Sequence, residues 1–170
     1  MLQFLFLTVV AASVCRGQDQ SVTASFSGLY GGTVGDEFSQ TSYEIVGPIT
    51  AVKIWTGVAT LHGIQVSYGN VWSNLNGAAW GTMVEMYLEP NENIVQVQGS
   101  YAYWVVTSLT FITSLGRTFV FGNQSGSTFL ALPLDQGAVL RAVSGRAGTY
   151  LYAIGFHWGA YPTKAMPCKA

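Results

Sequence analysis

The sequence predicts a single all-β domain, and three observations support this. Only 9% of the 170 residues are charged, 49% are hydrophobic and 20 are glycines. Threonine, serine, valine, tyrosine and tryptophan are abundant and helix formers are scarce, a composition typical of strands and turns. Short apolar or alternating runs are separated by turns that contain glycine. The chain is long enough for one domain with a substantial core.

Alternation within the runs justifies individual strands. In Ile94-Val95-Gln96-Val97-Gln98 the glutamines flank Val97, so we expect one wet face and one dry face. The segments that we expect to form strands are 22–27, 36–40, 49–57, 62–68, 71–72, 82–88, 94–101, 104–113, 118–122, 128–132, 139–144 and 150–158. Periodicity alone does not choose among a sandwich, a barrel and a prism.

The N-terminus predicts entry into the secretory pathway. Residues 1–17 have the pattern of a signal peptide, with an apolar run from residue 2 to residue 12 followed by small residues. A signal anchor is the alternative, but the apolar run is too short to span a bilayer. We therefore expect a secreted, extracellular protein without a membrane span, with secretory granules as one route. Residues 18–24 would form an N-terminal lead.

Cysteine usage leaves two interpretations open. Removal of residues 1–17 would also remove Cys15, so Cys168 would be alone in the mature chain. Cys168 lies in the predicted C-terminal tail, residues 163–170. It could pair with a second chain and form a dimer, pair with a small thiol, or be an unimportant tail residue.

Charge and motifs argue against several functional classes. The formal net charge of −1 disfavours nucleic-acid and anionic-membrane binding. His62 and His157 lie far apart in sequence, and no nucleophile elbow, zinc-protease motif or phosphate-binding loop occurs. The acidic pairs Asp36-Glu37 and Glu89 with Glu92 stand at turns, where we expect solvated charge. We predict no enzymatic activity, no cofactor and no zinc or calcium site.

A glycosylation signal stands in a polar turn between two predicted strands. The triplet Asn123-Gln124-Ser125 has the N-x-S pattern and is flanked by glycines. In a secreted chain it predicts that Asn123 accepts an N-glycan.

Two glycine-marked loops suggest a family. Tyr30-Gly31-Gly32 lies near the start, and residues 144–158 form a glycine loop that runs into a strand-like segment. With blocks at 26–32, 47–51, 65–73, 94–99, 116–117, 121–122 and 139–141, their order and spacing resemble jacalin-related lectins and their animal branch, the zymogen granule protein 16 family. The resemblance covers residues 25–162 and implies a β-prism of three four-stranded antiparallel sheets.

The resemblance also implies a metal-independent site for a hexose. Backbone amides of Gly31 and Gly32 and of a late loop would surround the sugar, and the late loop of the family reads G-x-x-x-D. The matching late-loop residues here are Gly148, Thr149, Tyr150, Leu151 and Tyr152. Plain turn chemistry is the alternative explanation for the three glycines.

A tyrosine therefore occupies the position of the aspartate of the family. A phenol is bulkier and neutral, so Tyr152 could fill the cavity or form a stacking wall for a different glycan. Loss of a charged acceptor that faces two hydroxyls would cost about 2–3 kcal/mol.

The resemblance implies a basic surface in the better-known animal members, and here aromatic residues would stand in its place. If the loops lie as in the family, one end of the prism gathers Tyr101, Tyr103, Trp104, Tyr150 and Tyr152. Tyr103 would belong to the site, whereas we expect Trp104 to lie in the core. The loop 99–104 has no cation, and acids follow the first glycine loop, which disfavours sulfated polyanions as ligands.

These observations lead to one functional prediction and two alternatives. We predict a jacalin-type lectin that binds glycans or glycoproteins, with mannose-type glycans as one option and with specificity altered by Tyr152. The first alternative is a protein-interaction or granule-packaging module that has lost sugar binding. The second is a subunit that pairs through Cys168 and acts multivalently.

Overall fold

The computed structural model describes residues 23–160. The predicted signal peptide 1–17, the tail 163–170 with Cys168, and all but the last two residues of the lead 18–24 lie outside the described residues. The limits of the domain, 25–162, remain a prediction. Among residues 23–160, no helix is long and apolar enough to cross a membrane.

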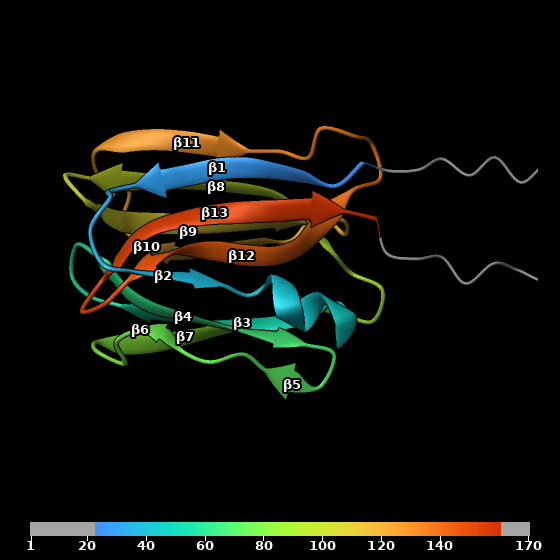
Figure 1. Ribbon diagram of the computed structural model, residues 1–170, viewed down its shortest axis with the longest axis horizontal. Coiled ribbons are helices and arrows are strands. Elements are labelled where there is room, and N and C mark those ends of the chain that lie inside the picture. The colour runs from blue at the N-terminus through green and yellow to red at the C-terminus, as the bar shows by residue number, and fades with distance from the viewer. Residues whose placement is uncertain (1–22, 161–170) are drawn as a thin grey trace, which may run out of the picture.

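Three antiparallel sheets enclose a shared core (Figure 1). The first sheet has the order β1 (Ser25–Gly31), β13 (Leu151–Gly159), β12 (Val139–Ala147) and β2 (Asp36–Ser39). The second has the order β10 (Thr118–Gly122), β9 (Val105–Thr113), β8 (Ile94–Ala102) and β11 (Ser127–Ala131). The third has the order β5 (Val71–Trp72), β4 (Leu61–Tyr68), β3 (Ile49–Thr56) and β7 (Thr82–Tyr87).

The all-β prediction and the three-sheet arrangement are confirmed, with two small additions. The two-residue strand β6 (Asn76–Gly77) also pairs with β4, so the third sheet has five strands. A short 3-10 helix, η1 (Thr41–Ile45), follows β2. Neither element has a hydrophobic period long enough to be recognised from the sequence.

The core consists of side chains that alternate inward from all three sheets. Ile64 of β4, Leu109 of β9 and Phe156 of β13 are fully buried, and Trp158 is 1% exposed. Burial of a large apolar side chain contributes about 1.5–3 kcal/mol, so these inward faces supply the main stabilisation. The strands also fix where the connecting turns emerge.

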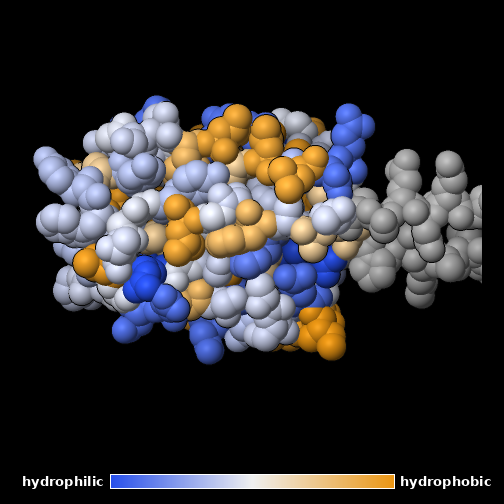
Figure 2. All heavy atoms as spheres, turned by 45° about the horizontal axis from the view of Figure 1, so that its top comes forward, coloured by the Kyte–Doolittle hydropathy of each residue, from blue (hydrophilic) through white to orange (hydrophobic). Residues whose placement is uncertain are grey.

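The first and second sheets meet along their edge strands β1 and β11. The rings of Tyr30 and Phe129 stack 4.1 Å apart, and the Tyr30 hydroxyl donates to the Leu130 carbonyl at 3.5 Å. Hydrophobic side chains also gather on the face that Figure 2 turns toward the viewer. Leu29 of β1 and Leu130 of β11 are among the exposed hydrophobic residues, with exposed fractions of 50% and 52%.

Two strands continue past glycines at which the sequence prediction stopped them. β1 was expected to end at residue 27, but a register shift between Phe26 and Leu29 carries it on to Gly31. Gly28, with φ of 79°, lies within this bulge. β12 continues beyond the predicted end at residue 144 and passes Gly145, where a Cβ would collide with the Ala153 carbonyl of β13.

The turns divide between the two ends of the prism (Figure 1). One end, which we call the loop end, lies away from both described termini and contains the turns at 32–35, 57–60, 103–104, 123–126 and 148–150. The other end contains η1, the connection 88–93 and the first and last described residues. Both predicted glycine loops belong to the loop end.

Candidate functional site

The first glycine loop and the late loop meet in the structure. The Gly32 amide donates to the Tyr152 carbonyl at 2.9 Å. A Cβ on Gly31 would collide with that same carbonyl oxygen, and Gly31 has φ of 125°. Glycine is therefore required at position 31 by this close approach, and segments more than a hundred residues apart form one local surface.

The side chain of Tyr152 lies between the two loops. A Cβ on Gly35 would collide with the Tyr152 ring, and a Cβ on Gly148 would come within 3.2 Å of Tyr152 Cε2. The Tyr150 and Tyr152 rings meet edge to face at 6.1 Å. The half-buried ring of Tyr152 thus occupies space beside both glycine loops.

The late loop supplies a compact turn rather than a row of exposed side chains. The Gly148 amide donates to the Tyr150 carbonyl at 3.0 Å, which closes the turn. Thr149 is exposed and Tyr150 is half-buried, whereas the Leu151 side chain is fully buried in the core. Leu151 can therefore contribute to a surface site only through its backbone.

The turn between β8 and β9 lies against the first glycine loop. A Cβ on Gly32 would come within 2.6 Å of Trp104 Cβ. Tyr103 has a positive φ of 56° and an exposed fraction of 92%. Trp104 is 56% exposed, so the prediction that it lies in the core was wrong. The two-residue hairpin turn places Trp104 outside the strand that was predicted to contain it.

Not all of the predicted aromatic residues reach the surface of this end. Tyr101 packs against the core cluster. Tyr103 and Trp104 form a pair with ring centroids 6.1 Å apart, and Tyr150 and Tyr152 form a second pair. The aromatic character of the loop end therefore resides in these two pairs.

The sequence did not indicate His62, which lies beside the late loop, or Trp80, which contacts His62. The ring of His62 lies 4.8 Å from that of Tyr150 and 6.3 Å from that of Trp80. His62 Nδ1 lies 3.3 Å from the Thr149 carbonyl oxygen. Trp80 is 62% exposed. Only closure of the prism brings β4 to the late loop, so no local pattern could have identified either residue.

The Arg146 side chain at the loop end is paired with an acid. The Arg146 side chain donates through Nη1 to the Gly35 carbonyl at 3.0 Å and through Nη2 to the Glu37 carboxylate. Asp36 is exposed beside this pair. Arg146 thereby ties the first glycine loop to β12, and its charge is compensated by Glu37.

The described residues bring together no group of three or more His, Cys, Asp or Glu side chains that could hold a metal ion. His157 is half-buried on β13, where Nε2 lies 2.9 Å from Ser144 Oγ and the ring stacks on Phe26 at 4.5 Å. Burial lowers the pKa of His157 below its ordinary value. These contacts are those of a packed structural side chain.

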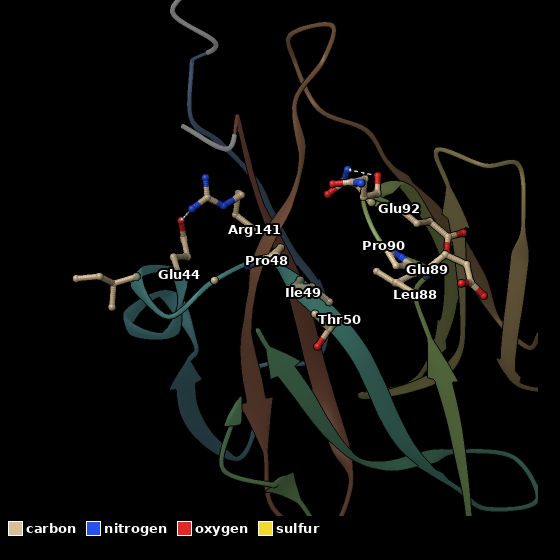
Figure 3. A pocket seen from close by; sticks show the side chains of 13 residues that line it. Glu44, Pro48, Ile49, Thr50, Leu88, Glu89, Pro90, Glu92 and Arg141 are labelled. Atoms are coloured by element: carbon tan, nitrogen blue, oxygen red, sulfur yellow. Dashed lines mark hydrogen bonds and ion pairs between the residues drawn. The ribbon is translucent and has the colours of Figure 1, made fainter. Parts of the chain in front are cut away.

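A large pocket lies at the opposite end of the prism (Figure 3). It has a volume of about 1120 Å³. Glu44 and Arg141 lie on one side, Pro48 and Ile49 between, and the segment 88–93 on the other. None of the predicted site residues lines this pocket.

Glu92, at the edge of this pocket, was predicted to be solvated and is instead buried. Its side chain has an exposed fraction of 0% and pairs with Arg117 at 2.5 Å. Arg117 Nε and Thr113 Oγ1 also donate to Glu92. Hydrogen bonds from Arg117 are the main reason that the pKa of Glu92 falls to about 2. Its position in a turn predicted that Glu92 is exposed to solvent. Its partner Arg117 lies in the turn between β9 and β10, which the local sequence around Glu92 does not reveal.

Comparisons with known proteins agree with this geometry. The family model described as Jacalin-like lectin domain matches residues 27–157. The chain is 40% identical over 168 residues to zymogen granule membrane protein 16 of Homo sapiens, covering 99% of this chain and 100% of the relative. It is 30% identical to prostatic spermine-binding protein of Mus musculus, covering 94% of this chain and 75% of the relative.

Solved structures show the same architecture. A prostate-specific WGA16 glycoprotein lectin superposes with a TM-score of 0.70 and 32% identity, covering 80% of this chain and 99% of that one. An artocarpin–mannotriose complex superposes with a TM-score of 0.68 and 25% identity, covering 80% and 97%. The family and fold are those of non-enzymatic carbohydrate-binding proteins. The chain, a three-sheet β-prism with two meeting glycine loops, belongs to the jacalin-like lectin family.

Proposed function

We propose that the protein is a secreted lectin that binds glycans or glycoproteins at the loop end without a metal ion. Its specificity differs from that of the family pattern because Tyr152 replaces an aspartate. The observation on which this rests is the meeting of Gly31 and Gly32 with the 148–152 segment, with the Tyr152 ring lying beside both loops.

The chemistry of the loop end favours ligands with an apolar sugar face. Without a carboxylate at position 152, hydroxyl recognition loses about 2–3 kcal/mol. The exposed rings of Tyr103 and Trp104 offer faces on which the C–H surface of a sugar can stack. A glycan that spans several sugar units, mannose-type or other, would use this aromatic surface better than a single hexose would.

The route to the extracellular space is supported by two observations. The apolar run at the N-terminus fits a signal peptide. The similarity to zymogen granule membrane protein 16 extends over 99% of this chain, which supports passage through secretory granules.

A protein-interaction or granule-packaging role is the second candidate function. It is favoured by the 92% exposure of Tyr103 and the 62% exposure of Trp80, since exposed aromatic residues also anchor protein interfaces. Pairing through Cys168 would make either function multivalent. A dimer that reductant dissociates, and that Cys168→Ser does not form, would support this pairing; a wild-type monomer under oxidising conditions would exclude it.

A glycan array in the presence of a chelator tests the lectin proposal. We expect the wild-type protein to bind, and Tyr103→Ala to lose about threefold or more in affinity because its stacking face is gone. Tyr87→Ala is the matched control, since Tyr87 is an exposed tyrosine of the third sheet. Silence of the folded wild-type protein on the array would exclude glycan binding and leave the interaction role.

A further inference from the structure

The turn that contains the N-x-S triplet is open to solvent. Residues 123–126 connect β10 to β11, and all four are exposed. The glycines at its two ends, Gly122 and Gly126, have φ of 74° and 80°. The turn therefore projects from the sheet and leaves the Asn123 side chain at the surface.

The fold anchors this turn without using the hydroxyl that glycosylation requires. The Asn123 side-chain amide donates to the Val58 carbonyl at 2.9 Å. Ser125 donates from its amide to Ser100 Oγ at 3.1 Å and accepts at its carbonyl from Thr107 Oγ1 at 2.9 Å. Among the hydrogen bonds of residues 23–160, Ser125 thus participates through its backbone alone.

The turn 123–126 contacts two segments, and each of these segments contacts or adjoins residues of the candidate site. On one side, Val58 belongs to the turn 57–60, and a Cβ on Gly57 would collide with His62, whose ring contacts Tyr150. On the other side, a Cβ on Gly126 would come within 2.9 Å of Ala102 Cα, the residue before Tyr103. Asn123 consequently stands at the rim of the aromatic loop end.

We propose that Asn123 bears an N-linked glycan and that this glycan limits the access of large ligands to the loop end; the second step rests on the proposed function. A lipid-pyrophosphate-linked oligosaccharide is the donor. Its anomeric C–O bond breaks, a bond from the anomeric carbon to Asn123 Nδ2 forms, and Nδ2 loses a proton while the lipid pyrophosphate leaves. The remaining N–H can still donate to Val58.

The consequence for binding follows from the size of the modification. An N-glycan is bulky and hydrophilic, so it stays in solvent and occupies the space above the protein surface around its attachment point. A polymeric ligand must approach across that rim, whereas a small oligosaccharide can enter beside it. The glycan therefore acts as a size filter for the site.

The modification is tested on the full chain secreted from mammalian cells. We expect the wild-type protein to have an additional mass of one oligosaccharide, which an N-glycan-releasing amidase removes. Ser125→Ala destroys the triplet but keeps the Asn123 bond to Val58, and it should have the mass of the bare polypeptide. The mass of the bare polypeptide for the wild-type protein would overturn the proposal.

The size filter is tested with immobilised mannan and a soluble trimannoside as probes. We expect Ser125→Ala to bind mannan about threefold or more tightly than the glycosylated wild-type protein, with trimannoside affinity unchanged. Equal mannan affinities would overturn the filter. If neither protein binds mannan or trimannoside, both the size filter and mannose-type binding are overturned. The mass measurement decides separately whether Asn123 is glycosylated.

Discussion

Tyrosine at position 152 changes both the shape and the charge of the surface between the glycine loops. Its ring packs beside Gly35 and Gly148, and its carbonyl accepts the Gly32 amide. A carboxylate here would be an acceptor of charge-assisted hydrogen bonds, which are about twice as strong as neutral ones. Contacts of the Tyr152 main chain thus hold the two loops together, and we propose that its side chain alters the ligand chemistry.

The different exposure of two tryptophans predicts different losses of unfolding free energy when each is replaced by alanine. Trp104→Ala should change the free energy of unfolding by less than about 1 kcal/mol, because the ring is 56% exposed. Trp158→Ala should cost about 3–5 kcal/mol, because Trp158 is 1% exposed and its loss leaves a cavity. Urea unfolding of both variants measures this, and a comparable loss for the two would contradict the exposed position of Trp104.

The family resemblance carried by the glycine loops predicted that these loops lie together, but it could not predict their side-chain neighbours. The glycine loops at Gly31 and Gly148 were predicted and do meet around Tyr152. The contact of His62 with Tyr150 depends on a hairpin from another sheet, so no local sequence pattern predicts it. Trp104 was misjudged because alternation was extended one residue into the hairpin turn.

The connection between β7 and β8 is fastened to the turn after β9 by a single buried carboxylate. Glu92 receives hydrogen bonds from Arg117, Thr113 and the Glu89 amide. Arg117 also donates to the Tyr87 carbonyl at 2.7 Å, so the same cluster joins the second and third sheets. A charged or polar group that loses its partner in such a cluster lowers the free energy of unfolding, because it stays buried without a hydrogen bond.

Glu92→Gln should therefore destabilise the protein by about 2 kcal/mol. Glutamine keeps the shape but loses the charge that Arg117 pairs with. The matched control is Glu89→Gln, an exposed neighbour on the same connection, for which we expect a change within about 0.5 kcal/mol. Thermal unfolding measures both, and equal melting temperatures for the two variants would contradict a structural role for the buried pair.

Strand existence could be predicted more fully than strand length. Alternating runs such as 94–98 predicted β8, and its observed start at Ile94 agrees. β1 continues through Gly28 because a bulge forms there, and β12 continues through Gly145 because a residue without a Cβ lets the partner carbonyl approach closely. Such tolerance depends on the partner strand, so the sequence of one strand does not reveal it.

The closed prism pairs its earliest strand with its last, since β1 and β13 are hydrogen-bonded neighbours. Alternating strands alone left a sandwich, a barrel and a prism open, and the order of the family-like blocks decided among them. The loop end could be located on that basis, although the two glycine loops lie more than a hundred residues apart in sequence.

Acid should weaken the folded protein in a defined range. The pKa of Glu92 is lowered from 4.5 to about 2 in the folded state, so the unfolded chain takes up its proton first. The stabilisation is fully present above about pH 4.5 and is lost as pH falls toward 2. Unfolding free energies measured across this range should decline less steeply for Glu92→Gln, and parallel profiles would contradict the assignment.

The central claim, that the loop end is a glycan site altered by Tyr152, is tested most directly by titrating methyl α-mannoside into wild-type protein and Tyr152→Asp. Tyr87→Asp serves as the control for an added carboxylate elsewhere. We predict that Tyr152→Asp binds about tenfold or more tightly than wild type, because a charged acceptor returns to an intact backbone frame, whereas Tyr87→Asp does not. A correctly folded Tyr152→Asp that binds no better than wild type would contradict the claim.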